Sequence, residues 1–301
     1  MSTEMLAIRQ WLSRSSPLAD YWALTKPDVN LLILITTAAG FCLARPVQSV
    51  GFPILLLVHT LAGTLLVASG TATLNQYVER RFDAQMRRTK RRPLAARRIE
   101  PSRALCFGIS LSVFGAIYLA AAVNLLASLL AILTLLSYLL IYTPLKRKTP
   151  LCTLVGAFPG AAPPLIGWAA ASGRLDLAAW VLYGMVFLWQ FPHFMAIAWM
   201  YREDYQRAGY MVLPEGESKA SLMAWETMLP SAGLLVLSFA PMLLAKNGLF
   251  SATGAFFLSI CFLYYGAQLA LRKTNVAARR LLLASIVYLP LVFLWMVLGR
   301  M

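Results

Sequence analysis

The sequence has few charged residues and little chain outside its apolar runs. Asp, Glu, Lys and Arg make up only 13% of the 301 residues, about half of their share in a soluble domain. About 20 apolar residues span a bilayer as a helix, and the sequence contains nine such runs. We therefore predict an all-α polytopic membrane protein whose nine transmembrane helices lie near residues 29–44, 52–74, 104–123, 125–142, 151–171, 177–200, 222–245, 249–271 and 281–298.

Cysteine pairs are also lacking, and the first 26 residues do not show the pattern expected of a signal peptide. The four cysteines lie singly within apolar runs and form no Cys-x-x-Cys motif, which argues against a redox or zinc site of that kind. Residues 1–26 contain no continuous apolar core and are predicted to be a polar cytoplasmic lead-in. Residues 27–301 are predicted to form a single transmembrane domain, whose first helix is long enough if it begins at Pro27, a favoured first helical position.

The basic residues are distributed asymmetrically between the two ends of the predicted helices. The N-terminal segment and the loops after runs two, four, six and eight hold 23 of the 27 Lys and Arg residues. Because cytoplasmic loops are enriched in Lys and Arg, the N-terminus and these loops are predicted to be cytoplasmic. The net charge of +15 is thus an orientation signal, and it does not indicate a nucleic-acid partner.

Acidic residues on the same side require a separate explanation, since they contribute little to orientation. Asn75, Glu79 and Asp83 at the end of run two are spaced four residues apart and would form one stripe on a helix. Their oxygens suit Mg²⁺, which typically takes one or two carboxylates and completes its shell with water and substrate phosphate. An alternative is a solvated helix end with internal salt bridges.

A dense group of basic residues follows this stripe directly, and Arg makes forked contacts with phosphate oxygens. Acids on a helical face beside these residues indicate a metal-bridged diphosphate site. The group consists of Arg87, Arg88, Lys90, Arg91, Arg92, Arg97 and Arg98.

Run six ends in a second acidic pair, Glu203 and Asp204. If runs two and six are neighbours, two metal ions could bridge one diphosphate; the alternative is an ordinary interfacial pair. Within the run, Pro192 and its neighbours 191–194 are expected to interrupt the helix. His193 lies in this stretch, where ionisable groups are costly and often functional, and it is a candidate either for contact with the substrate or for a hydrogen-bonded structural role.

Runs four and five contribute the remaining features of the predicted site. Tyr142 and Lys146, at the inner end of run four, could reach the same phosphate cluster, although this loop could equally be a basic anchor. Run five contains six Gly and Pro residues between positions 156 and 167, so its helix must be irregular. Broken membrane helices are tolerated beside a cavity, and we therefore expect a central cavity next to this run.

Six segments together resemble the signatures of the UbiA-type intramembrane prenyltransferases, and the last four narrow the resemblance to members that farnesylate haem. They are Asn75-x-x-x-Glu79-x-x-x-Asp83, 88–94 (RTKRRPL), 142–147 (YTPLKR), 160–168 (GAAPPLIGW), 189–194 (WQFPHF) and 201–209 (YREDYQRAG). The resemblance extends from about residue 25 to about residue 214 and agrees with nine helices.

The resemblance implies transfer of a farnesyl group from farnesyl diphosphate to a vinyl group of haem b, with addition of water to give haem O. It also implies Mg²⁺, a bacterial inner membrane with the active site on the cytoplasmic side, and a downstream haem-modifying or terminal-oxidase assembly partner. The expected metal ligands are Asn75, Glu79, Asp83, Glu203 and Asp204. The other expected site residues are Tyr142, Lys146, Arg80, Arg88, Arg91, Arg92, Arg147, Arg202 and His193.

Two departures from the family pattern and three rival functions remain. Glu79 stands where the superfamily commonly has Asp, and Arg81 stands where many members have a further acid. The acceptor could instead be another aromatic ring used in quinone biosynthesis. An anion transporter with a basic mouth would give no reason for the acidic stripe. A phosphotransferase acting on nucleotide-activated alcohols is disfavoured because the sequence has no Asp-Gly-x-x-Ala-Arg motif.

Overall fold

The structure is a computed structural model that describes residues 16–44, 51–213, 218–244 and 248–299. All regular elements in these ranges are helices, which confirms the predicted class. Most of the predicted lead-in, residues 1–15, lies outside the described ranges. The elements are α2 (Pro17–Leu24), α3 (Pro27–Ala44), α4 (Ile54–Asp83), α5 (Pro101–Ala122), α6 (Leu125–Leu136), the π-helix η1 (Ser137–Tyr142), α7 (Thr143–Leu145), α8 (Cys152–Gly160), α9 (Pro163–Ser172), α10 (Leu177–Met200), α11 (Arg202–Arg207), α12 (Ser218–Leu237), α13 (Ala240–Leu244), α14 (Gly248–Arg272) and α15 (Asn275–Leu298).

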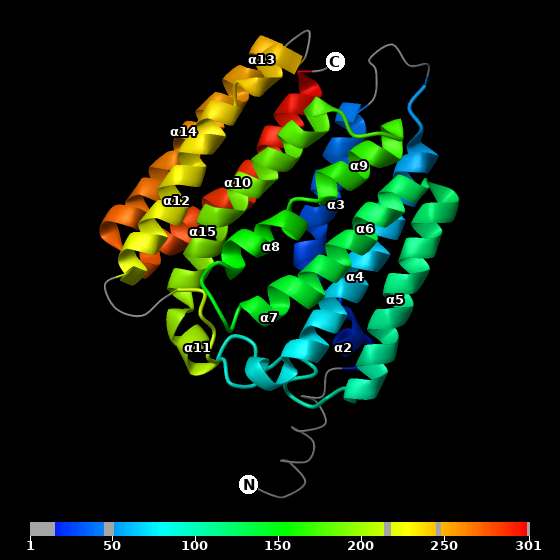
Figure 1. Cartoon of the computed structure of the whole chain (residues 1–301), viewed down its shortest axis with the longest axis vertical. Coiled ribbons are helices and arrows are strands. Elements are labelled where there is room, and N and C mark those ends of the chain that lie inside the picture. Colours follow the sequence, from blue (N-terminus) through cyan, green and yellow to red (C-terminus); the bar gives the residue numbers. More distant parts are fainter. Residues whose placement is uncertain (1–15, 45–50, 214–217, 245–247, 300–301) are drawn as a thin grey trace, which may run out of the picture.

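The predicted number of membrane spans is confirmed within the described ranges. Nine stretches there are long and apolar enough to cross a bilayer, and the first begins at Pro27. The fourth span joins α6, η1 and α7, and the fifth joins α8 and α9. The segment that contains α2 precedes the first span and lies at one end of the bundle (Figure 1).

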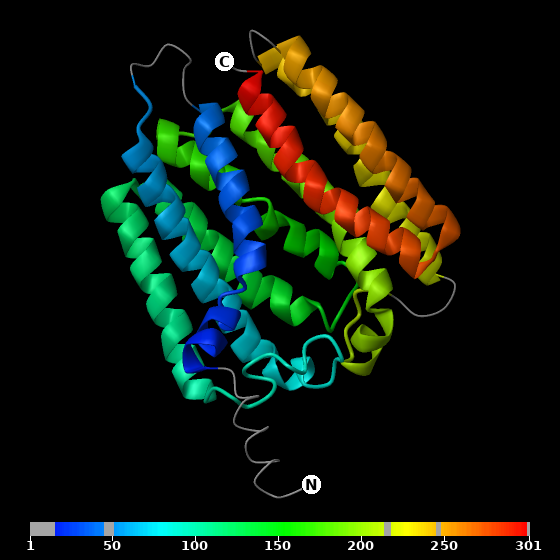
Figure 2. The ribbon, with the colours of Figure 1, turned by 180° about the vertical axis from the view of Figure 1, so that it is seen from behind.

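Six helices form a ring, in which α3, α4, α6, α8, α10 and α15 each contact the next, and α15 contacts α3. Seen from behind, α3 lies between α4 and α15 (Figure 2). Helix α5 packs outside the ring on α4, while α12 and α14 pack outside α10 and α15. Helix α9 packs against α3 and α6. This arrangement encloses a central space and positions residues from distant parts of the sequence around it.

Small residues allow the closest helix contacts. Gly40 of α3 faces Pro164 of α9, and Gly167 of α9 faces Thr37 of α3, so closely that a β-carbon at either glycine would overlap the opposing backbone. Close approach through small residues replaces the hydrophobic driving force that membrane helices lack. These contacts therefore fix α9 against α3.

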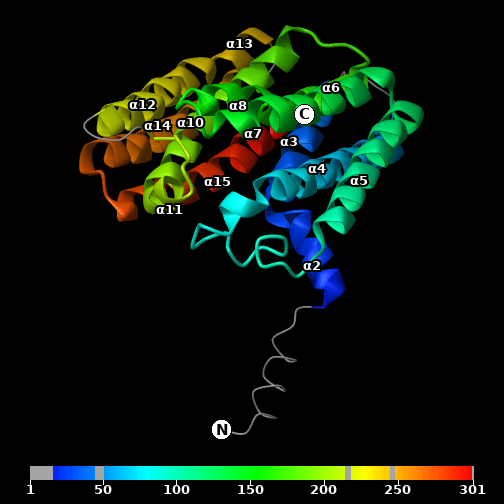
Figure 3. The ribbon, with the colours of Figure 1, turned by 60° about the horizontal axis from the view of Figure 1, so that its bottom comes forward.

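Helix α4 extends beyond the bilayer at the end that carries the acidic stripe. Its 30 residues correspond to about 45 Å, whereas the hydrocarbon core is about 30 Å thick. The last turns, which contain Glu79 and Asp83, therefore continue past the apolar part of the helix. The 84–100 loop, α7 and α11 gather at this same end of the bundle (Figures 1 and 3).

The two proline-containing runs behave differently. The fifth span is broken between Gly160 and Pro163, as predicted. The predicted interruption of run six is wrong, since α10 is continuous and contains Pro192 in its interior. Proline removes one backbone donor, but membrane helices tolerate this loss where neighbouring helices surround them. Helix α10 packs between α12 and α15, which supplies that support.

Candidate active site

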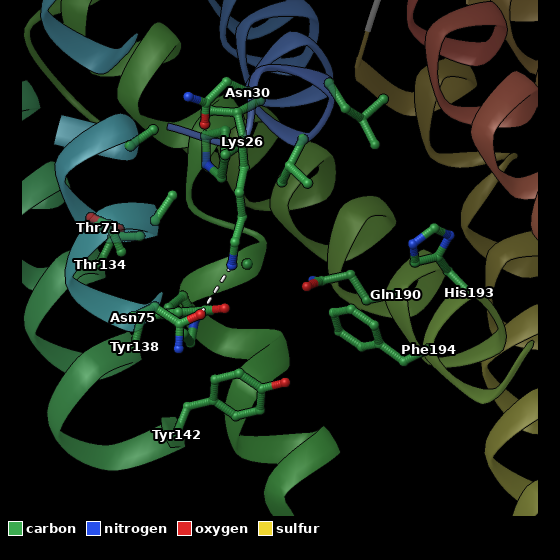
Figure 4. A pocket seen from close by; sticks show the side chains of 18 of the residues that line it. Lys26, Asn30, Thr71, Asn75, Thr134, Tyr138, Tyr142, Gln190, His193 and Phe194 are labelled. Atoms are coloured by element: carbon green, nitrogen blue, oxygen red, sulfur yellow. Dashed lines mark hydrogen bonds between the residues drawn. The ribbon is translucent and has the colours of Figure 1, made fainter. Parts of the chain in front are cut away.

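A cavity of about 430 Å³ lies inside the ring, with walls from α3, α4, α6, η1, α8, α9, α10 and α15. The expected cavity beside the fifth span is thus present, since Pro159, Gly160 and Pro163 line it. Leu32, Ile33 and other aliphatic residues make much of its wall apolar. Titratable and amide side chains project into it from several helices (Figure 4). Such a cavity suits a ligand with an apolar body and a charged head.

The predicted stripe on α4 faces this cavity. Asn75, Glu79 and Asp83 all line it, and all three are buried. The Asn75 side-chain nitrogen donates to Glu79 Oε2 at 2.9 Å. This bond leaves Asn75 Oδ1 available as an acceptor. Four-residue spacing on a continuous helix therefore brings three oxygen-bearing side chains to one wall, as the sequence predicts.

Each member of the stripe contacts a cation from a different segment. Lys26 Nζ donates to Asn75 Oδ1 at 3.0 Å, a bond drawn in Figure 4. Lys146 Nζ lies 2.9 Å from Glu79 Oε1. These two lysines come from the α2–α3 junction and from the residue after α7.

The third cation is Arg92 of the 84–100 loop. Its Nη1 lies 3.0 and 2.9 Å from the two carboxylate oxygens of Asp83. Because arginine is always charged in proteins, this contact pairs the Asp83 carboxylate with a fixed positive charge. Three cations therefore meet three oxygen ligands at one end of the cavity.

Lys26 reaches the cavity through an unusual backbone conformation. Its φ is +51°, in the left-handed region that costs a non-glycine residue about 1–2 kcal/mol. Local strain of this kind is frequent at functional sites. Burial lowers the pKa of Lys26 to about 7, and the nearby Arg92 contributes to the shift.

Lys146 is a permanent cation in this setting. Burial by itself would lower its pKa, but Tyr142 and the Glu79 carboxylate raise the pKa well above the usual value. The ammonium also lies 4.5 Å from the ring centre of Tyr142 and 5.8 Å from that of Tyr138. Both tyrosines belong to the π-helical turn and line the cavity. π-Helical turns are rare and recur at functional sites.

The second acidic motif lies beside the first, but its two members differ. Asp204 is buried and accepts hydrogen bonds from the backbone N–H of Arg88 at 3.0 Å and from Arg207 at 2.9 Å. Burial would raise the pKa of Asp204, but the N–H groups of Arg88 and Arg87 and the Arg207 guanidinium lower it. Asp204 therefore anchors the loop after α4, while Glu203 is exposed and lies outside the cavity lining.

The predicted substrate-binding arginines fall into two groups. Arg88 and Arg92 line the cavity. Arg202 points away from it and donates to Asn275 Oδ1 at the start of α15, at 2.7 Å. The predicted arginines outside the lining are Arg80, Arg91, Arg147 and Arg202.

The donor set near the stripe fits a hard divalent cation only in part. Among the described residues, no group of three or more His, Cys, Asp and Glu side chains is arranged to hold a metal ion. Asn75, Glu79 and Asp83 nevertheless offer one amide oxygen and two carboxylates. This set suits Mg²⁺, which draws its remaining ligands from water and phosphate. The residues therefore fit a metal that arrives with a phosphate-bearing ligand.

His193 lines the cavity from α10, and its Nδ1 lies 2.7 Å from Ser285 Oγ of α15. Its ring stacks on Trp189, with 4.7 Å between the ring centres. His193 thus lies within a membrane-spanning helix, as predicted, and its side chain lines the cavity. Whether it contacts a substrate stays a prediction.

The polar lining residues that sequence reasoning did not identify include Lys26, Tyr138, Gln190 and Tyr210. Tyr138 could have been found, since it lies four residues before Tyr142 on the same helical face. Tyr210 donates to Glu79 Oε1 at 3.0 Å, but it follows its motif in a loop with no periodic signal. Lys26 immediately precedes a helix, and no local pattern in the sequence shows where its side chain points.

Comparisons with known proteins identify the family and the fold of the chain. A profile of the UbiA prenyltransferase family matches residues 33–297. A protein of Solibacter usitatus named protoheme IX farnesyltransferase is 46% identical over 287 residues, covering 93% of this chain and 98% of its own. A structure of digeranylgeranylglyceryl phosphate synthase superposes with a TM-score of 0.71 at 17% identity, covering 94% of this chain and 98% of its own. The structure of a UbiA homologue of Archaeoglobus fulgidus, bound to DMAPP and Mg²⁺, superposes with a TM-score of 0.66 at 14% identity, covering 92% of this chain and 99% of its own.

Proposed function

Because the chain belongs to the UbiA prenyltransferase family, we propose that it transfers a farnesyl group from farnesyl diphosphate to a vinyl group of haem b. The acceptor is proposed from the similarity over nearly the full length to the protein named protoheme IX farnesyltransferase. Both substrates are apolar bodies with anionic heads. They match a cavity with an apolar wall and a cluster of cations at one end.

The proposal rests mainly on one observation: Lys26, Lys146 and Arg92 contact Asn75, Glu79 and Asp83 of α4, respectively. A diphosphate that binds here gains charge-assisted hydrogen bonds from these cations. As the C–O bond of the allylic diphosphate breaks, negative charge grows on the leaving group. Fixed cations in a buried site stabilise that charge without reorganisation.

Mg²⁺ is proposed to bind together with the diphosphate, held by Asn75, Glu79 and Asp83. When bound, it would supply Lewis-acid stabilisation of the diphosphate oxygens. Lys26 and Lys146 would then contact the phosphate in place of Asn75 and Glu79. Asp204 is proposed to act through the loop that it anchors, and Glu203 remains a predicted ligand only by its place in the motif.

The farnesyl carbon released from diphosphate carries positive charge, and aromatic faces attract cations. Tyr138 and Tyr142 lie beside the phosphate end of the cavity, with ring centres 5.1 Å apart. They are proposed to stabilise the allylic cation until the vinyl group attacks it. No nucleophilic side chain is required for that attack, because the vinyl π electrons form the new carbon–carbon bond.

The site is proposed to face the cytoplasm of a bacterial membrane, because the loops at this end of the bundle hold most of the basic residues.

The haem pool of cells that lack this protein, compared with cells to which it is restored, tests the proposed function. Mass spectrometry should detect haem O only when the protein is present. Prenylated quinone precursors that change in place of haem O would assign a different aromatic acceptor. A haem pool and a quinone pool that both stay unchanged would contradict prenyl transfer to either.

A further inference from the structure

Gln190 presents a fixed hydrogen-bond acceptor to the cavity. Its side-chain nitrogen donates to the carbonyl oxygens of Ala157 at 3.0 Å and Val186 at 3.2 Å. Carbonyls cannot donate, so the amide orientation is set and Oε1 faces away from them. Oε1 lies against Gly160, where a β-carbon would overlap it. Figure 4 shows this oxygen turned into the cavity, and no group among the described residues donates to it.

The hydrogen bonds of Ser285 assign the tautomer of His193 and thereby a second acceptor. The Ser285 hydroxyl donates its single proton to the carbonyl oxygen of Leu282 at 2.6 Å. With the hydroxyl proton directed to Leu282, we assign the proton of the 2.7 Å contact between His193 Nδ1 and Ser285 Oγ to the histidine nitrogen. In a neutral imidazole the other nitrogen then carries the lone pair. His193 Nε2 is consequently a proton acceptor.

Both acceptors lie on the wall of the cavity that is formed by α10. Gln190 and His193 are three residues apart on α10, which places them on the same helical face, and both line the cavity. Phe194 and Ile197 from the same helix surround them with apolar surface. A water molecule that donates one O–H to each acceptor keeps its oxygen lone pairs free. This is the arrangement required of a nucleophilic water assisted by a general base.

We propose that Gln190 Oε1 and His193 Nε2 hold and activate the water molecule that completes the reaction. This inference rests on the proposed function. Attack of the vinyl π electrons on the farnesyl carbon leaves a carbocation on the vinyl carbon next to the porphyrin ring. A lone pair of the water oxygen forms a C–O bond to that carbon, and one water proton passes to His193 Nε2. The product carries a hydroxyl group, and the diphosphate retains the electron pair of the bond broken first.

The competing fate of the same carbocation is loss of a proton from a neighbouring carbon. That loss yields an alkene lighter by the mass of one water molecule. The ratio of the hydrated to the dehydrated product therefore reports on the water site alone. It is also independent of the amount of folded enzyme, because both products form after the same prenyl transfer.

The proposal is tested with purified enzyme, haem b, farnesyl diphosphate and magnesium, with both products measured by mass spectrometry. Gln190→Met removes the acceptor oxygen while keeping the side-chain length. The Gln190→Met variant should fold normally, because the carbonyl oxygen of Ala157 still accepts a hydrogen bond from the backbone N–H of Ala161 at 3.1 Å. The hydrated-to-dehydrated ratio should fall roughly tenfold in this variant, and on the order of 100-fold in His193→Phe, which lacks the base.

Two further variants separate a water-positioning role from a structural one. Tyr183→Phe removes another hydrogen bond between α10 and α8, to Phe158 O, but Tyr183 does not line the cavity, and its product ratio should be unchanged. Gln190→Glu keeps an oxygen acceptor and should restore most of the hydrated product. In water enriched in the heavy oxygen isotope, the label should appear in the product hydroxyl.

The experiment distinguishes failure of the water site from failure of the proposed prenyl transfer. If the unmutated enzyme forms no prenylated haem, the proposed function itself is contradicted. If it forms haem O, and Gln190→Met and His193→Phe lower total product at an unchanged ratio, the two residues act in binding or folding and the water site is overturned. Loss of all product in both variants would overturn it equally, since prenyl transfer precedes hydration.

Discussion

Lys146 and Glu79 form a buried ion pair, with 2.9 Å between Nζ and Oε1 and side chains only 12% and 8% exposed. The pair joins the end of the fourth span to the last turns of α4, and both residues line the cavity. Removal of one member of a buried pair strongly destabilises the charge that remains. A diphosphate that binds beside the pair gives Lys146 a second anionic partner.

Replacement of Lys146 by methionine should lower turnover on the order of 100-fold, because one fixed positive group at the leaving diphosphate is lost. The variant should also lose stability, because Glu79 keeps only Tyr210 and Asn75 as donors, so turnover is measured per amount of folded protein. Lys148→Met, which removes an exposed charge two residues away, serves as the matched control. Equal turnover of the two variants would remove Lys146 from the reaction.

Lys26→Met should raise the KM for farnesyl diphosphate and lower kcat/KM by roughly 10- to 100-fold, since a hydrogen bond to a charged group contributes about 1.5–3 kcal/mol. Lys273→Met is the control, because Lys273 is also a lysine with positive φ (+50°, against +51° for Lys26) but is exposed. Any effect of the backbone conformation is therefore shared by both variants. Unchanged kinetics for Lys26→Met would show that this lysine serves only the fold.

Gly167→Ala should lower the thermal unfolding temperature in detergent. The new methyl group would overlap Thr37 O on α3, and such overpacking costs about 1–3 kcal/mol. Gly184→Ala is the matched control, because its β-carbon would approach only the flexible side chain of Leu237, at 3.3 Å. A Gly167→Ala protein as stable as the parent would contradict the close α3–α9 contact.

A cysteine placed at Lys90, in a variant without the four native cysteines, should react with membrane-impermeant reagents only from the cytoplasmic side. Lys90 is exposed and lies in the loop that carries the largest group of basic residues, which sets orientation. Labelling in broken cells but not in intact cells is the expected result. Labelling in intact cells would place the site on the opposite side of the membrane.

The acidic stripe and the broken fifth span could be predicted from the sequence because both depend on local rules. Four-residue spacing places Asn75, Glu79 and Asp83 on one face of any helix. Closely spaced Gly and Pro residues interrupt a helix wherever it lies. Pro192 shows the limit of the second rule, since a single proline was accommodated by the helices packed around α10.

Residues that depend on tertiary contacts could not be predicted in the same way. The direction of Lys26 follows from a positive φ at a helix junction, and that of Arg202 follows from Asn275 at the start of α15. Gln190 lies within a recognisable motif, but its role depends on which carbonyl oxygens its amide nitrogen meets. The basic residues of the 84–100 loop look equivalent in the sequence. Three of them, Arg88, Arg91 and Arg92, were predicted to bind substrate, but only Arg88 and Arg92 line the cavity.

The central claim is that the oxygen ligands of α4 support diphosphate departure in a haem farnesyltransferase. Its most direct test is conversion of haem b and farnesyl diphosphate by purified protein, with and without Mg²⁺, for the parent, Asp83→Ala and the exposed-acid control Asp28→Asn. The parent and Asp28→Asn should form haem O only with Mg²⁺, and folded Asp83→Ala should form none. Haem O formation by Asp83→Ala at the parent rate, or by the parent protein without any divalent metal, would contradict the account.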